Sequence, residues 1–250
     1  MQYVFVITYG RSGSTVLMKF LNSIDGYCIR GENNGILSHF AAGIQMLRQA
    51  QADQENSKQT PDAPWYGLHD TNTKSIAKGI ADLFTREVLR PHDGARAIGF
   101  KEIRFTPEDI SDEDYDAVID FMAAEFPNSR FIFNTRNWRQ VVRSGWWRLR
   151  PDLGRLRACI EQSDARFKNS KELLGDRAFL IDFSEFKGKP EGFRTLLDWL
   201  GEEMSDEQLV ALTEKKLTHV KGQYDERGFY TKARRALYWY LVDNRAFKRS

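Results

Sequence analysis

Cysteine, histidine and long apolar runs are scarce in this sequence, and each scarcity argues against a class of protein. Cys28 and Cys159 are the only cysteines, too few for a disulfide framework, so we expect a reducing, cytoplasmic location. Four histidines and no Cys/His cluster at ligand spacing predict no metal site. No apolar stretch approaches the roughly 18 residues of a membrane span, and no basic segment opens the chain, so neither a span nor a signal peptide is expected.

The sequence also lacks an excess of positive or negative charge. The 37 Lys and Arg nearly balance the 35 Asp and Glu, and the resulting net charge of +2 does not indicate a nucleic-acid partner. Hydrophobic residues make up 41% of the 250, enough for a sizeable core, and we expect one domain over residues 1–250. Residues 52–64 are polar, contain two prolines and lack periodicity, so we predict a mobile loop there.

Apolar runs and helical patterns alternate along the chain. Four runs are short, mostly apolar and not strictly alternating, which predicts strands buried on both faces, over residues 4–8, 97–101, 130–135 and 178–183. Helical spacing covers residues 14–24, 36–51, 73–89, 112–126, 138–149, 153–174, 190–200 and 206–217. The alternation predicts an α/β fold with a parallel sheet flanked by helices. Such sheets bind ligands at the carboxyl ends of their strands, which groups residues 9–15, 101–104 and 136–139.

The loop after the first strand has the composition of a phosphate site. Residues 9–15 read YGRSGST and lead into a helix, whose N-terminal amides and dipole favour an anion. Gly10 and Gly13 permit backbone angles that other residues resist, and Arg11 adds a fixed cation. Ser14 stands where the loop of nucleoside triphosphatases has its Lys, so the triphosphatase pattern is absent. A plain strand-to-helix turn with incidental glycines is the alternative.

A second anion site is predicted at the carboxyl end of the third strand. Arg136 lies there, and Ser144 follows eight residues later. A guanidinium fork and a hydroxyl suit a phosphate monoester. The alternative is a basic amphipathic helix with solvated arginines, namely Arg139, Arg143, Arg148 and Arg150.

The two motifs, in this order, resemble those of sulfotransferases that use 3′-phosphoadenosine 5′-phosphosulfate (PAPS). Residues 9–15 are similar to their 5′-phosphosulfate loop, and Arg136 with Ser144 is similar to their 3′-phosphate motif. Residues 183–200 resemble the segment after the family's last core strand, whereas Trp138 stands where the family usually has Pro. The resemblance implies a P-loop-NTPase-like three-layer α/β sandwich. It also implies metal-free, in-line transfer of a sulfuryl group from PAPS to a hydroxyl acceptor, with PAP as product.

The resemblance implies roles for individual residues. Those expected to bind PAPS are Arg11, Ser12, Gly13, Ser14, Thr15, Arg136, Ser144 and, in a late basic segment, Lys221. Arg11 and the loop amides would also act in catalysis, by stabilising charge on the leaving oxygen. Lys101, at the end of the second predicted strand, would donate to the sulfuryl group, although a Lys101–Glu102 surface pair is the alternative.

Glu32 is the candidate general base, because its position after the first helix resembles that of the catalytic Glu in tyrosylprotein sulfotransferases and related branches. A solvated loop glutamate is the alternative. Other branches use His, so His69 and His39 are the alternate bases. Arg104, His69 and Trp65 are candidate contacts for the acceptor.

The acceptor is the least determined part of the hypothesis. Similarity to prokaryotic members favours a hydroxyl of a carbohydrate or small metabolite over a protein tyrosine. Two other functions stay open. A nucleotide kinase or other phosphotransferase is disfavoured by the missing Lys, and a non-catalytic binder of nucleic acid or another anion, using residues 138–150, is disfavoured by the near-neutral charge. The oligomeric state is also left open.

Overall fold

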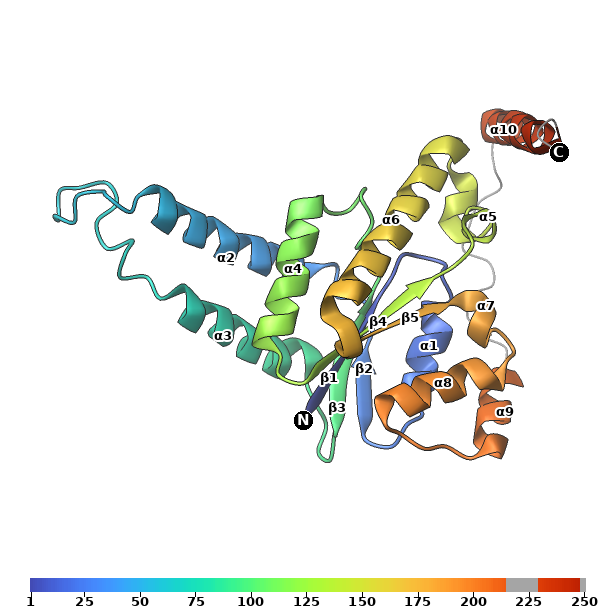
Figure 1. Cartoon of the computed structure of the whole chain (residues 1–250), viewed down its shortest axis with the longest axis horizontal. Helices are drawn as coiled ribbons and strands as arrows, with labels where there is room; N and C mark the ends of the chain where they lie inside the picture. Colours follow the sequence, from blue (N-terminus) through green and yellow to red (C-terminus); the bar gives the residue numbers. More distant parts are fainter. Residues whose placement is uncertain (215–228, 248–250) are drawn as a thin grey trace.

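The computed structural model describes residues 1–214 and 229–247, and within them five parallel strands form a central sheet (Figure 1). The strands are β1 (Gln2–Ile7), β2 (Tyr27–Arg30), β3 (Ala97–Glu102), β4 (Ser129–Thr135) and β5 (Ala178–Asp182). Their order in the sheet is β2-β3-β1-β4-β5, and every neighbouring pair is parallel. The loops that follow β1, β3 and β4 therefore leave from the same edge, on adjacent strands.

Helices cover both faces of the sheet. One face packs against α2 (Ile36–Asp53), α3 (Thr73–Phe84), α4 (Asp112–Glu125) and α6 (Leu153–Leu174). The other packs against α1 (Ser14–Leu21), α8 (Pro190–Leu200) and α9 (Asp206–Glu214). The described residues also form a π-helical turn (Thr85–Leu89), α5 (Trp138–Val141), the 3-10 turns η2 (Gly145–Leu149) and η3 (Gly175–Arg177), α7 (Phe183–Phe186) and α10 (Phe229–Phe247). The predicted P-loop-NTPase-like three-layer α/β sandwich is confirmed.

Strand β1 shows how an unbroken apolar run fits this architecture. Phe5 and Ile7 belong to the core on the α2–α4 side, and Val4 and Val6 belong to the core on the α1–α8 side. All four side chains are fully buried. A strand covered by helices on both faces needs apolar residues at every position, so its apolar residues are continuous and do not alternate with polar ones.

Strand β2 and the bend after α5 differ from the prediction. β2 has only four residues and lies at the edge of the sheet beside β3, with Arg30 exposed. The helix predicted over residues 138–149 is wrong as one unit, because α5 ends at Val141 and η2 begins at Gly145. Between them Ser144 is extended, and Gly145, the first residue of η2, has a φ of +52°, a conformation that costs glycine little.

The α2 and α3 helices project together from the body of the molecule (Figure 1). Residues 54–72 join them through turns, so most of the predicted loop over residues 52–64 lies in this connection, while residues 52 and 53 end α2. The helix predicted over residues 206–217 is present as α9 up to Glu214, and its last residues lie outside the described part. Among the helices of the described residues, none has the length and apolarity to cross a membrane.

Candidate functional site

The loop between β1 and α1 is shaped by two glycines. Arg11 and Gly13 both have left-handed backbone conformations, with φ of 72° and 94°. A Cβ at Gly10 would lie 2.1 Å from the Trp146 ring, and one at Gly13 would lie 2.2 Å from the Phe183 ring. No side chain caps the N-terminus of α1. The loop therefore presents main chain, the first-turn amides of α1 and the positive end of its dipole to the adjoining space.

Two guanidinium groups meet beside this loop. Arg136 Nη1 donates to the Arg11 carbonyl over 2.9 Å, and the Arg136 guanidinium lies over the Phe183 ring at 4.2 Å. Arg11 Nε donates to Ser144 Oγ over 3.0 Å. Burial lowers the pKa of Arg136, and the neighbouring Arg11 lowers it further. Within the described residues neither guanidinium forms an ion pair with a carboxylate, so this pair of cations favours an anionic ligand.

Buried Tyr9 links the loop that carries Arg11 to the loop that carries Arg136; we call these two the anion loops. The Arg136 amide donates to Tyr9 Oη over 2.8 Å, and Tyr9 Oη donates to Asp164 Oδ1 on α6 over 2.8 Å. Burial raises the pKa of Asp164 to about 7, helped by the charges of Asp182 and Glu161, while the Tyr9 hydrogen bond acts to lower it. Sequence reasoning missed Asp164, because an isolated acid in a helix carries no local signal.

Ser12 faces the protein interior. Its side chain is fully buried and accepts a hydrogen bond from Thr8 Oγ1 over 2.7 Å. Thr8 Oγ1 also lies 2.7 Å from the Asn134 carbonyl of β4. Of the residues predicted to bind PAPS, Ser12 is therefore placed to support the loop rather than to present its hydroxyl to a ligand.

Glu32 and Lys101 form an ion pair at the edge of the sheet. Lys101 is the last residue but one of β3 and is buried, whereas the Glu32 side chain is 45% exposed. The loop that carries Glu32 is fixed by buried Glu102, whose Oε2 accepts from the amides of Asn33 and Gly35, each over 2.9 Å. The alternative of a Lys101–Glu102 surface pair is wrong, because successive residues of β3 point to opposite faces and Glu102 is used in this loop.

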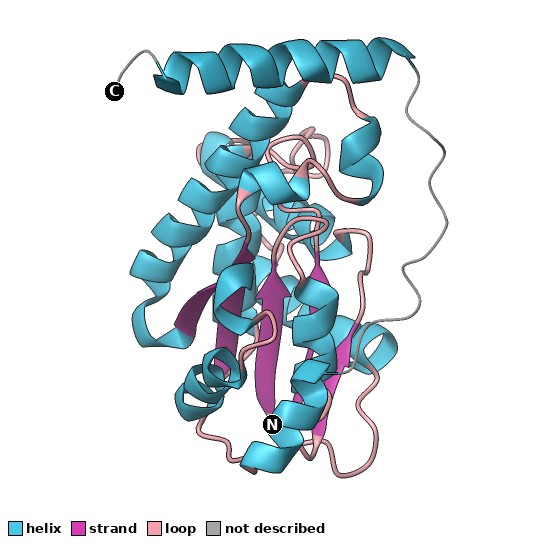
Figure 2. Ribbon diagram, turned by 90° about the vertical axis from the view of Figure 1, so that its right-hand side faces the viewer, coloured by secondary structure: helices cyan, strands magenta, loops and turns pink. Residues whose placement is uncertain are grey.

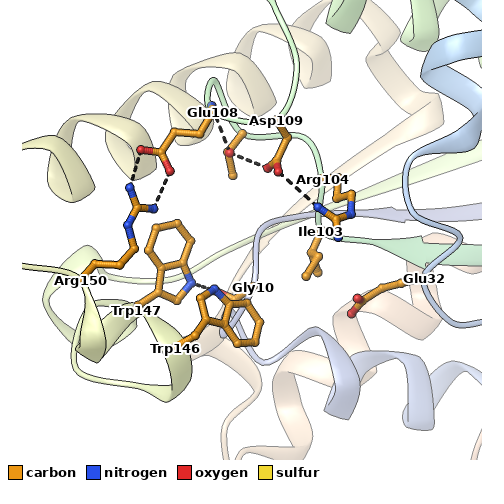
Figure 3. Close-up of a pocket in the computed structure, with 10 residues that line it drawn as sticks. Gly10, Glu32, Ile103, Arg104, Glu108, Asp109, Trp146, Trp147 and Arg150 are labelled. Carbon is orange, nitrogen blue, oxygen red and sulfur yellow. Dashed lines mark hydrogen bonds and ion pairs between the residues drawn. The ribbon is translucent and has the colours of Figure 1, made fainter. Parts of the chain in front are cut away.

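Two adjacent cavities open at this edge. The first, which we call the anion cavity, has about 290 Å³ and is lined by Gly10, Arg11, Gly13, Ser14, Thr15, Val16, Glu32, Lys101, Ile103, Arg136, Trp146 and Phe183. The second, which we call the tryptophan cavity, has about 350 Å³ and is lined by Gly10, Glu32, Ile103, Arg104, Thr106, Glu108, Asp109, Trp146, Trp147 and Arg150 (Figure 3). Glu32 borders both cavities, and so does the Trp146 ring.

Apart from Glu32, the charged groups that line the tryptophan cavity are paired with one another (Figure 3). Arg150 Nη2 donates to Glu108 Oε1 over 2.7 Å, and hydrogen bonding from Arg150 lowers the pKa of Glu108. Arg104 lies 3.7 Å from Asp109, and Trp147 Nε1 donates to the Gly10 carbonyl over 2.9 Å. The cavity thus combines indole surface with charges that largely cancel.

Comparison with known proteins now identifies the family. A model of the family described as "Sulfotransferase family" matches residues 3–206. The chain belongs to the sulfotransferase family. The crystal structure of sulfotransferase STF9 from Mycobacterium avium is similar at 14% identity and a TM-score of 0.43, over 97% of this chain and 76% of that one. A search of curated proteins found no match.

Some predicted residues of this sulfotransferase lie away from both cavities. Trp65 and His69 belong to the connection between α2 and α3, where His69 Nε2 lies 3.0 Å from the Gln54 carbonyl. His39 is exposed on α2 and lines neither cavity. Lys221 falls outside the described residues. In the described part of the chain, no three His, Cys, Asp or Glu side chains gather as ligands for a metal ion.

Proposed function

We propose that this chain transfers a sulfuryl group from PAPS to a hydroxyl of a carbohydrate or small polyhydroxylated metabolite. The observation that carries the proposal is the position of Glu32 between two cavities of different character. One cavity holds Arg11 and Arg136, which form no ion pair with a carboxylate of the described residues, and the other has aromatic walls and paired charges. A donor in the first and an acceptor in the second would meet at Glu32 and Lys101.

The residues of the anion cavity fit the phosphates of PAPS. Arg11, the amides at the start of α1 and Arg136 would hold them, with Ser144 beside Arg11. A side chain at Gly10 or Gly13 would displace a neighbouring ring, so the space next to the loop depends on both glycines. When bound, PAPS supplies an activated sulfuryl group. The protein then contributes positioning and charge stabilisation, as in phosphoryl transfer.

In this proposal Glu32 removes the acceptor proton. An acceptor hydroxyl must lose its proton as the new S–O bond forms, and a carboxylate that faces the tryptophan cavity can accept it. Its partner Lys101 is held in the buried end of β3. As Glu32 gains a proton, its attraction for Lys101 weakens, and the Lys101 ammonium becomes a donor for the negative charge that develops in the anion cavity.

The tryptophan cavity supports a neutral acceptor. The carboxylates of Glu108 and Asp109 already face Arg150 and Arg104, so neither a cationic nor an anionic acceptor gains a strong unpaired partner. Trp146 offers an apolar ring face, and the paired groups offer donors and acceptors for hydroxyls. This chemistry suits a sugar ring or a similar polyol.

A thermal-shift titration with PAP, ADP and ATP with Mg²⁺ tests the donor. A ligand that binds only the folded protein raises the melting temperature according to its affinity. We expect a metal-independent shift with PAP that exceeds the shift with ADP, because only PAP carries a 3′-phosphate. A shift with ATP and Mg²⁺ alone would refute the proposal and favour a phosphotransferase. If PAP binds, transfer of sulfate from PAPS to a panel of neutral sugars, acidic sugars and tyrosine peptides tests the acceptor class.

A further inference from the structure

Helix α10 lies outside the residues that the family model matches, yet it packs against the candidate site. Figure 2 shows α10 across the end of the molecule toward which the strands point. Trp239 of α10 stacks on Trp138 of α5, with ring centroids 5.4 Å apart and planes at 4°. The guanidinium of Arg143 lies 4.6 Å from the Trp239 ring. These contacts dock α10 on the helix that follows Arg136.

One arginine of α10 enters the protein interior. Arg235 is 2% exposed, and its guanidinium donates to three main-chain carbonyls. Nη1 bonds the carbonyls of Arg150 over 2.8 Å and Trp147 over 3.2 Å, and Nη2 bonds that of Val142. Val142 is the residue that caps the end of α5, Trp147 lies within η2, and Arg150 caps the end of η2. Carbonyls at helix ends lack intrahelical partners, and a cation is favourable there.

The segment held by Arg235 forms a wall of both cavities. Residues 142–150 contain a bend and a 3-10 turn, so main-chain hydrogen bonds of their own give them little support. Yet Ser144 must meet Arg11, Trp146 must cover Gly10, and Trp147 must reach the Gly10 carbonyl. The three hydrogen bonds from Arg235 hold the main chain of this short segment in place.

We propose that Arg235 is a positioning residue, which fixes residues 142–150 so that Ser144 and Trp146 stand at the two cavities. It acts through the main chain of that segment and touches neither cavity. The C-terminal helix is thereby part of the functional unit, although it lies beyond residues 3–206. The effect on ligand binding rests on the proposed function, because PAP is the ligand used to measure it.

The test compares full-length Arg235→Met, Arg235→Lys and Arg234→Met. Arg234 is the matched control, since it is the preceding residue on α10 but pairs with Asp152 at the surface over 3.0 Å. Hydrogen exchange of peptides covering residues 142–150 reports the local order directly. For Arg235→Met we expect exchange there to rise about tenfold or more, with β4 peptides unchanged, and PAP affinity to fall about ten- to a hundredfold. Arg235→Lys keeps a hydrogen-bond donor, so its exchange in residues 142–150 and its PAP affinity should lie between those of the wild type and Arg235→Met.

The outcomes separate this inference from the proposed function. Exchange in residues 142–150 that matches the Arg234→Met control would overturn the positioning role, and so would wild-type PAP affinity in Arg235→Met. If exchange rises equally in β4, Arg235 has a merely global structural role and the inference is wrong. If the wild-type protein does not bind PAP, the proposed function fails, and the exchange comparison still decides whether Arg235 orders the segment. If Arg235→Met does not fold, the Lys variant is judged by the same two measurements.

Discussion

Replacing Tyr9 by Phe removes one hydroxyl that joins both anion loops to α6. The ring keeps its volume, so no cavity forms. The change leaves the Arg136 amide without its 2.8 Å acceptor and the Asp164 carboxyl without its 2.8 Å donor. A buried group without a partner costs about 1–3 kcal/mol, and hydrogen bonds to charged groups are worth about 1.5–3 kcal/mol. We expect the free energy of unfolding to fall by about 2–4 kcal/mol, which lowers the melting temperature by roughly 5–15 °C.

The loss of unfolding free energy caused by Tyr9→Phe depends on pH. Burial raises the pKa of Asp164 from 3.8 to about 7 in the folded protein. The stability that this group contributes is therefore complete below about pH 4 and is lost as the pH rises through about 7. The Tyr9 hydroxyl stabilises the ionised carboxylate more than the neutral acid, so Tyr9→Phe should cost more at pH 8.5 than at pH 5.5. Asp164→Asn should remove this difference.

Urea unfolding at the two pH values, together with PAP titration, measures both effects. Tyr115→Phe is the matched control, because Tyr115 is also fully buried and its hydroxyl contacts Ser170 of α6 over 2.8 Å, away from Arg136. We expect the control to lose stability while it keeps PAP affinity, and Tyr9→Phe to lose both. The reasoning is refuted if Tyr9→Phe costs the same at both pH values, or if its PAP affinity equals that of the control.

Three further changes test separate parts of the site. Glu32→Gln should keep PAP affinity within about twofold and lower kcat by about 10²–10⁴, the usual contribution of a general base; normal turnover would move the base elsewhere. Arg136→Ala should weaken PAP about ten- to a hundredfold in a calorimetric titration, because a charged partner of the ligand is lost, and unchanged affinity would remove Arg136 from the donor site. Gly13→Ala should destabilise more than Gly67→Ala, since both have positive φ but only Gly13 meets a ring; equal melting temperatures would contradict the contact with Phe183.

The parallel sheet was predictable wherever its strands are buried on both faces. β1, β3, β4 and β5 each carry a run of apolar residues, which no exposed strand or loop would need. β2 has four residues and one exposed end, so too little sequence distinguishes it from the loop around it. The break between α5 and η2 was missed because residues 138–149 keep helical spacing. At Gly145 the positive φ and the Arg11 side chain, which would lie 2.8 Å from a Cβ there, both favour glycine, and the spacing of apolar residues carries no sign of either.

The candidate site was predictable where each residue follows a strand. Arg11 lies in the loop after β1, Lys101 lies near the carboxyl end of β3, and Arg136 directly follows β4. Parallel strands bring such positions together. Contacts that depend on strand order were not accessible, and the Glu32–Lys101 pair is one, since it requires β2 to lie beside β3. Trp65 and His69 suit a binding role by residue type, but the α2–α3 connection carries them away from the cavities.

Because the two anion loops follow neighbouring strands, the sheet fixes the distance between them. The loop with Arg11 follows β1 and the loop with Arg136 follows β4, and these strands are hydrogen-bonded in a fixed register. Adjacent strands lie about 4.8 Å apart, so the separation of the two loops is set by main-chain geometry. Residues that line only the tryptophan cavity after β3, such as Arg104, Glu108 and Asp109, can therefore change while the distance between the loops stays constant. The lining of the tryptophan cavity can thus vary without a change in the spacing of the two loops that carry Arg11 and Arg136.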